Sequence, residues 1–219
     1  MTRVEVPAPS WSTFEELREH ALACRSCPLA ETRTQVVFGV GDPHADLVFV
    51  GEGPGAEEDR QGIPFVGRAG GLLTRLIEGI GLTRDDVYIA NVVKCRPPGN
   101  RDPLPVEITA CRPYLEAQLD FIRPRVLVTL GNFATKLLSG KPTGITRVHG
   151  QEQEVTLGGR TVLLYPLFHP AAALYTPRML DVLEADFARL SDLLGRDPEP
   201  APAEPEPVPV AQPVQLGLF

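Results

Sequence analysis

The sequence contains four cysteines whose spacing is typical of a metal site. They are Cys24, Cys27, Cys95 and Cys111. The first two form a C-x2-C pair that closes an expected helix, whereas a thioredoxin-type pair normally opens one after a strand. Four thiolates suit a tetrahedral zinc ion or a [4Fe–4S] cluster. The spacing does not choose between zinc and iron, and unrelated buried thiols are the alternative to a metal site.

Three short segments rich in glycine or polar residues directly follow apolar runs and form a second group of candidates. They are GEGPG (51–55), KCRPPGNR (94–101) and FHPAAAL (168–174). When strands alternate with helices, the sheet is mainly parallel, and a site lies beyond the carboxyl ends of its strands. We therefore expect these three loops to converge on one site.

The apolar periodicity predicts the strands and helices that carry these loops. Strands are expected at 46–50, 85–93 and 125–130, followed by a hairpin that turns at Gly158 and Gly159 and reaches Tyr165. Helices are expected at about 13–24, 67–81, 105–119, 132–138 and 178–194. This alternation predicts an α/β sandwich around a largely parallel sheet.

The charge balance limits what the chain binds. Its 219 residues carry a formal net charge of −7, which argues against a generally basic nucleic-acid binder. DNA contact would need a local patch, for which the best candidates are Lys94, Arg96 and Arg101.

No apolar run is long enough for a membrane span, and the first residues hold no apolar signal core, so we expect a cytoplasmic protein without a membrane partner. Disulfides are disfavoured in that compartment.

The composition changes near the end of the chain. Residues 1–195 have the apolar periodicity of one globular domain. Residues 196–214 are rich in proline and acidic side chains with little to bury, which predicts an extended tether. The last five residues, 215–219, then carry three apolar side chains.

The sequence resembles the family 4 uracil-DNA glycosylases, which are iron–sulfur members of the uracil-DNA glycosylase superfamily. Four blocks in the same order carry the resemblance, from about Cys24 to Leu190: the C-x2-C pair with its two partners, GEGPGAEEDRQGIPFVGRAGGLL, NVVKCRPPGNRDP and FHPAAAL. The resemblance implies a three-layer α/β/α sandwich with a central, mainly parallel four-stranded sheet. It also implies that the four cysteines hold one structural [4Fe–4S] cluster, which favours iron over zinc.

The resemblance further implies a DNA repair glycosylase, which flips uracil out of DNA and hydrolyses its N-glycosidic bond to leave an abasic site. Phe65 matches the aromatic residue on which uracil stacks in this family. Asn91 matches the residue that recognises the pairing edge of uracil, because its amide offers both a donor and an acceptor. Gly51 and Gly53 would let backbone amides approach the base closely.

Two further residues match the family's catalytic groups. His169 matches the histidine that bonds uracil O2 as negative charge develops. Glu52 matches the carboxylate that would orient or deprotonate water, or offset the charge on the sugar. The candidates for placing this water are Asn100, Glu58 and Asp59.

Leu174, five residues after His169, is a candidate to enter the gap left by the flipped base, and a leucine buried in the core is the alternative. Two other functions are alternatives. Relatives that trap uracil-DNA covalently use a histidine in the loop after the second strand, and that loop has none here. A non-catalytic iron–sulfur DNA-binding protein is disfavoured because the catalytic and base-binding residues are all present.

The final five residues resemble the short peptide with which bacterial replication and repair proteins bind the DNA sliding clamp. Gln215 would offer amide hydrogen bonds, and the apolar pocket would be filled by Leu216, Leu218 and Phe219. A tail that folds back onto the domain is the alternative. We expect a monomer that acts on uracil-containing DNA, with the clamp as a second partner.

Overall fold

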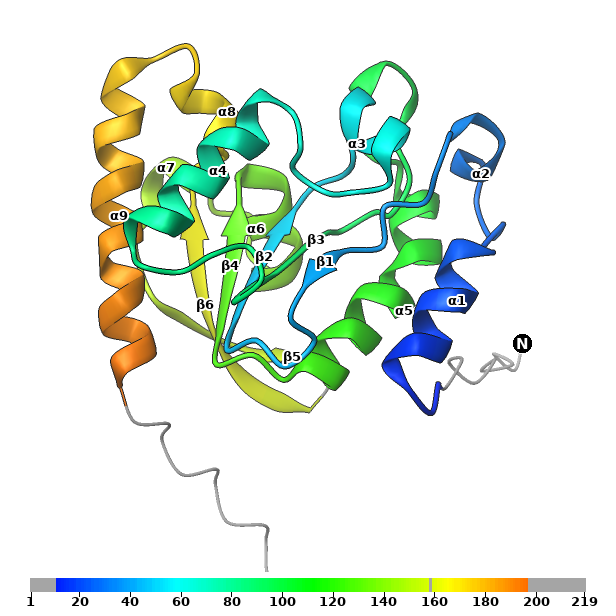
Figure 1. Cartoon of the computed structure of the whole chain (residues 1–219), viewed down its shortest axis with the longest axis horizontal. Coiled ribbons are helices and arrows are strands. Elements are labelled where there is room, and N and C mark those ends of the chain that lie inside the picture. The colour runs from blue at the N-terminus through cyan, green and yellow to red at the C-terminus, as the bar shows by residue number, and fades with distance from the viewer. Residues whose placement is uncertain (1–10, 158, 197–219) are drawn as a thin grey trace, which may run out of the picture.

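Figure 1 shows the computed structural model of the chain, which describes residues 11–157 and 159–196. Its centre is a six-stranded sheet with the strand order β1-β3-β2-β4-β6-β5. In chain order the strands are β1 (Val40–Gly41), β2 (Leu47–Gly51), β3 (Tyr88–Asn91), β4 (Val126–Leu130), β5 (Gln153–Leu157) and β6 (Arg160–Leu167).

Helices fill most of the connections between these strands. They are α1 (Phe14–Leu22), α2 (Leu29–Thr32), α3 (Ala56–Gln61), α4 (Arg68–Gly79), α5 (Pro105–Ile122), α6 (Asn132–Ser139), α7 (Ile145–Val148), α8 (Pro170–Ala173) and α9 (Pro177–Gly195), with a short 3₁₀ helix, η1 (Pro98–Asn100). The five predicted helices are confirmed as α1, α4, α5, α6 and α9. In the described ranges, none of the helices has the length and apolar character needed to cross a membrane.

The inner part of the sheet is parallel, as predicted. Strands β3, β2, β4 and β6 are parallel neighbours, whereas β1 and β5 lie antiparallel at the two edges. The four-stranded sheet that the resemblance implies is therefore extended to six strands. The predicted hairpin supplies β5 and β6, but β1 has only two residues and is too short to show a periodic pattern.

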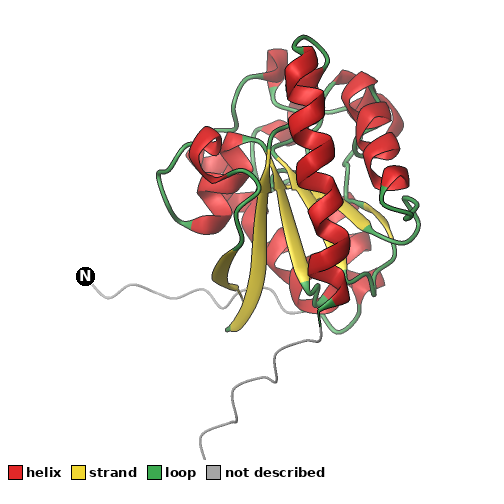
Figure 2. Ribbon diagram, turned by 90° about the vertical axis from the view of Figure 1, so that its left-hand side faces the viewer, coloured by secondary structure: helices red, strands yellow, loops and turns green. Residues whose placement is uncertain are grey.

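Helices cover both faces of the sheet. Successive side chains of a strand point to opposite faces, so Val48 and Val50 pack in one core while Leu47 and Phe49 pack in another. Helices α1 and α5 lie on one side of the sheet and α4 and α9 on the other (Figure 1). Figure 2 shows α9 running along the strands. Because both faces are covered, β2 is apolar and buried along its whole length.

The parallel strands end at one common edge. The last residue of β2, Gly51, pairs with the last residue of β3, Asn91. On the other side, Leu130 at the end of β4 pairs with Leu167 at the end of β6. The loops that follow β2, β3 and β6 therefore start close together, which confirms the predicted convergence.

A buried carboxylate connects the loop after β3 to helix α5. The side chain of Glu107 has no exposed surface and accepts a hydrogen bond from the amide of Leu104 at 2.8 Å. It also accepts two hydrogen bonds from the Arg101 guanidinium, at 2.9 and 2.6 Å. The bonds from Arg101 lower the pKa of Glu107.

We predict that Glu107→Gln lowers the free energy of unfolding by about 1–3 kcal/mol at neutral pH, because a buried, hydrogen-bonded charge is lost. Since the pKa of Glu107 is lowered in the folded protein, its stabilisation is present above the usual carboxyl pKa of about 4 and is lost as the pH falls. The difference from wild type should therefore shrink on acidification, which urea unfolding at two pH values measures.

The exposed pair Arg112–Glu116, one helical turn apart on α5, provides the control. Glu116→Gln should change the free energy of unfolding by no more than about 0.5 kcal/mol at either pH. A Glu107→Gln difference that is equal at both pH values would contradict a role for the charge.

Candidate active site

A cavity of about 550 Å³ opens beyond the carboxyl ends of β2, β3 and β6. Each of the three predicted loops contributes to its lining. The sequence-predicted residues that line it are Glu52, Gly53, Glu58, Phe65, Asn91, Asn100, Arg101 and His169. The structure thus brings the base-binding and catalytic candidates into one cavity.

Phe65 and Asn91 meet over Gly51 at the floor of this cavity. A Cβ atom at Gly51 would lie 2.5 Å from Asn91 Oδ1 and 2.6 Å from Phe65 Cζ, so any side chain there would displace one or both of them. Gly53 is also restricted, because a Cβ atom would lie 2.8 Å from Val93 Cγ2. Glycine at position 51 allows the aromatic ring and the amide to come together, whereas Gly53 gives room to Val93.

Asn91 has an acceptor that no protein group uses. Its side chain is buried, and in the described ranges its Oδ1 is the one buried side-chain polar atom without a hydrogen-bond partner. Leaving a buried polar group unpaired costs about 1–3 kcal/mol. A ligand with an N–H group beside Oδ1 would satisfy this acceptor.

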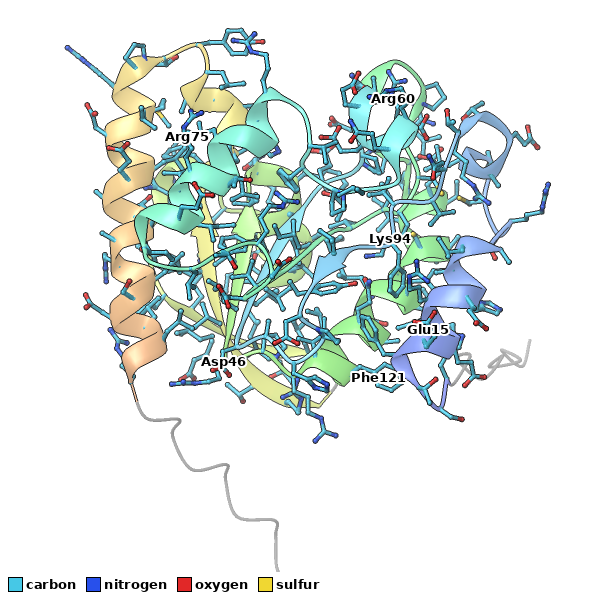
Figure 3. The ribbon with its side chains drawn as sticks, in the orientation of Figure 1. Glu15, Asp46, Arg60, Arg75, Lys94 and Phe121 are labelled. Carbon is cyan, nitrogen blue, oxygen red and sulfur yellow. The ribbon has the colours of Figure 1, made fainter. Side chains whose placement is uncertain are left out.

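The buried side chain of Lys94 holds the backbone of Asn91 in place. Its Nζ donates to the carbonyl of Asn91 at 2.9 Å and to Oε1 of Gln118. Gln118 in turn donates to the carbonyl of Phe38 and the hydroxyl of Tyr88, both at 2.9 Å. Burial lowers the pKa of Lys94 to about 8. Lys94 is 2% exposed and lies inside the molecule (Figure 3), so its predicted contact with DNA is wrong.

His169 is held as a neutral hydrogen-bond donor. Its Nδ1 accepts from the amide of Ala171 at 3.1 Å, at the start of α8. A nitrogen that accepts carries no proton, so the ring proton is on Nε2. Burial lowers the pKa of His169, which favours the neutral ring. The ring stacks near Phe65, with 5.6 Å between centroids.

The acidic residues near the cavity differ in what they contact. Burial raises the pKa of Glu52, and Asp102 raises it further. Glu58 lines the cavity, but its Oε1 accepts hydrogen bonds from two backbone amides, those of Val66 and Gly67, at 3.0 and 3.1 Å. Glu52 therefore has the carboxylate that is available for chemistry.

Asp59 does not line the cavity, so its predicted role in placing the water is wrong. Its side chain is buried, and Oδ1 accepts from the amides of Thr34 and Gln35 at 2.9 and 3.4 Å. The carboxylate therefore braces the loop between α2 and β1 instead of placing a water. The prediction failed because the three consecutive acidic residues at 57–59 give no sign of which one turns inward.

The rim of the cavity contains a pair that the sequence motifs did not reveal. Leu174 is partly buried against the core, but the next residue, Tyr175, is 78% exposed. The guanidinium of Arg68, which lines the cavity, lies 6.0 Å from the centre of the Tyr175 ring. The signal that could have identified Tyr175 is an aromatic residue directly after the FHPAAAL segment.

Arg96 is held by Asn100, because the Oδ1 atom of Asn100 accepts a hydrogen bond from the Nε atom of Arg96 at 2.7 Å.

The four cysteines surround a second, small cavity between α1, the end of β3 and α5. All four are free thiols. The amide of Lys94 donates to Cys111 Sγ at 3.2 Å, and Arg33 Nη1 donates to Cys95 Sγ at 3.4 Å. Donors of this kind stabilise thiolates that bind iron.

In residues 11–157 and 159–196, no three His, Cys, Asp or Glu side chains are close enough to hold a single metal ion. Four thiols around one cavity, three of which accept hydrogen bonds (Cys24 Sγ from the amide of Ser26 at 3.5 Å), are a donor set that suits a metal group with four thiolate ligands.

Comparison with known proteins agrees with this geometry. The family model of the Uracil DNA glycosylase superfamily matches residues 38–191. The "Type-4 uracil-DNA glycosylase" of Sulfurisphaera tokodaii is 47% identical over 186 residues, 83% of this chain and 84% of the relative. The protein of that name from Archaeoglobus fulgidus is 46% identical over 188 residues, 84% of this chain and 94% of the relative. A third, from Thermotoga maritima, is 50% identical over 159 residues, 72% and 81% of the two chains.

Proposed function

This chain belongs to the uracil-DNA glycosylase superfamily, and we propose that it removes uracil from DNA by hydrolysis of the N-glycosidic bond. The observation that carries the proposal is the unpaired, buried Oδ1 of Asn91 beside the ring of Phe65. An enzyme that cleaves a base from DNA first turns the nucleotide out of the stack into a pocket. The product is an abasic site, so the reaction is the first step of base excision repair.

Uracil matches the polar groups of the pocket. Its ring stacks on Phe65, its N3–H donates to Oδ1 of Asn91, and its O4 accepts from the same amide. Cytosine has an acceptor at N3 and an amine at C4, so both of these pairs would be mismatched. The bond from Lys94 to the carbonyl of Asn91 fixes the backbone position from which this side chain enters the pocket.

His169 and Glu52 stabilise the two opposite charges that develop as the glycosidic bond breaks. The bond between C1′ and N1 breaks with its electron pair on N1, which makes uracil an anion and leaves positive charge on the sugar. The neutral His169 donates to O2, where part of the negative charge lies. The carboxylate of Glu52 stabilises the sugar cation and accepts a proton from the water that bonds to C1′. That proton then passes to uracil.

We predict that the wild-type protein converts a single-uracil oligonucleotide into one that alkali cleaves, and leaves the matched cytosine oligonucleotide intact. Asn91→Asp should reduce uracil excision by several kcal/mol of transition-state stabilisation, on the order of 10³-fold, because a carboxylate repels O4. Gel analysis after alkali measures both results.

Two outcomes would contradict this assignment. Wild-type protein with a full complement of iron that leaves uracil in DNA would exclude the glycosylase. Near-normal excision by Asn91→Asp would show that Asn91 only supports the loop.

We also propose that Cys24, Cys27, Cys95 and Cys111 hold one [4Fe–4S] cluster. When bound, such a cluster cross-links distant segments through iron–thiolate bonds. The thiols come from the connection between α1 and α2, from the loop after β3 and from α5, so their ligation would hold the loop after β3, and α5 with it, against the end of α1. The proposed role is structural, and no step of base removal passes through the cysteines.

Cys95→Ser should purify with little iron and unfold at a lower temperature than wild type, because metal binding is coupled to local folding. Iron analysis and thermal unfolding measure the two effects separately. Wild type treated with a chelator is the control and should resemble the variant. A stable, iron-free and fully active Cys95→Ser protein would contradict the proposal.

The DNA is expected to run across the rim of the cavity. Arg96, Arg101 and Leu174 are the proposed contacts, the first two with phosphates and the third with the gap left by the flipped nucleotide. The guanidinium of Arg101 already bonds to Glu107, which presents it in a fixed position. We further propose that the protein acts as a monomer in the cytoplasm.

The tether (196–214) lies almost entirely outside the described residues, and the peptide 215–219 lies wholly outside them. From the sequence we propose that Gln215, Leu216, Leu218 and Phe219 bind the DNA sliding clamp. A fully extended tether of about 20 residues spans on the order of 60 Å, so clamp binding and base removal can occur together. This attachment would raise the enzyme's concentration at replicated DNA.

Deletion of residues 215–219 should abolish binding to the clamp in a pull-down assay and leave excision from a short oligonucleotide unchanged. A variant with Gln215, Leu216 and Phe219 replaced by alanine keeps the length of the tail and should behave in the same way. A truncated protein that still binds the clamp, or that loses activity on the oligonucleotide, would show that the tail has another role.

A further inference from the structure

The residue that stacks on the base has an unusual backbone. Phe65 has a φ of +53°, in the left-handed region that bulky residues rarely adopt. This conformation is unfavourable unless the surroundings enforce it, and such residues cluster at ligand sites. The orientation of the aromatic ring therefore depends on the groups that hold the peptide from Pro64 to Gly67.

Arg84 holds this peptide through its carbonyls. It lies in the connection between α4 and β3, outside the lining of the cavity. Its Nη2 donates to the carbonyl of Pro64 at 2.8 Å, and its Nη1 donates to the carbonyl of Phe65 at 3.2 Å. Nη1 also lies 3.4 Å from Thr74 Oγ1 on α4. The planar guanidinium can reach two successive carbonyls because its donors form a rigid fork.

Gly70 determines how closely this peptide packs against α4. A Cβ atom at Gly70 would lie 1.8 Å from the carbonyl oxygen of Phe65 and 2.0 Å from its carbon, so any side chain would displace Phe65. The next residue, Gly71, is also helical, but a Cβ atom there would have no neighbour within 4 Å. On the other side, Glu58 accepts from the amides of Val66 and Gly67.

We propose that Arg84 and Gly70 are positioning residues for base binding, which hold Phe65 in its left-handed conformation and so set the plane on which uracil stacks. The inference rests on the proposed function, because it names what orients the stacking ring of that site. Arg84 holds the carbonyls of the peptide, while Gly70 leaves room for it. Neither residue would touch the base.

The adjacent glycines give a matched pair of variants for the test. Gly70→Ala should raise the inhibition constant for free uracil and the KM for a single-uracil oligonucleotide by about tenfold. Gly71→Ala should leave both constants at the wild-type value, and its melting temperature should be equal or higher, since alanine favours a helix. Inhibition by free uracil measures base binding without any contribution from DNA.

Arg84→Gln should show a smaller increase in the same two constants, and Arg84→Lys should recover part of the loss because one donor remains. Arg75→Gln is the control, since Arg75 is exposed on α4 (Figure 3) and its removal changes the net charge equally. Melting temperatures of all variants separate a loss of stability from a loss of positioning. Should Gly70→Ala fail to fold, the Arg84 series decides the question.

The proposal is overturned if the folded variants lose only stability and keep the wild-type uracil inhibition constant. It is also overturned if the control variants Gly71→Ala and Arg75→Gln weaken uracil binding as much as Gly70→Ala and Arg84→Gln do. These results differ from a failure of the proposed function, in which the wild-type protein itself would neither bind uracil nor excise it.

Discussion

Lys94 is a buried cation between two cavities, and the arrangement of both depends on how its charge is accommodated. Its ammonium donates to the carbonyl of Asn91 and the amide of Gln118, while its backbone N–H donates to Cys111. Burying an ion without such partners costs several kcal/mol. Negative charge on the thiols of Cys111 and Cys95 would favour the ammonium and raise the pKa of Lys94. The base pocket and the cysteine cavity are thus parts of one polar unit.

The sequence predicted most of the fold because burial on both faces of a sheet leaves a clear pattern. The apolar run of β2 and the stripe of α4, with Leu72, Leu73, Leu76 and Ile77, follow directly from this packing. The edge strand β1 and the short helices α2, α3, α7 and α8 are too short for a periodic signal. Of the two strands beyond the four that the resemblance implied, β5 belongs to the predicted hairpin and β1 was not predicted.

The sequence predicted the site residues that directly follow strand ends. It did not predict which polar side chains in the loops point into the interior. Asn91 and His169 follow apolar runs at one edge of the sheet, so their place in the cavity follows from topology. Lys94 and Asp59 lie in polar segments that look exposed, yet both turn inward. Arg84 is 19 residues from Phe65 in sequence, and its role depends on a backbone angle that no residue pattern shows.

The hydrogen bond from Ala171 to His169 links the charge of the imidazole ring to the shape of the loop that follows it. A proton on Nδ1 would compete with the amide of Ala171 for the same lone pair, so the charged ring and the capped helix α8 are mutually exclusive. Acid would therefore do more than change the ionisation of His169. It would remove the side-chain cap of α8, the helix that directly precedes Leu174 and Tyr175, while Nε2 would keep its proton.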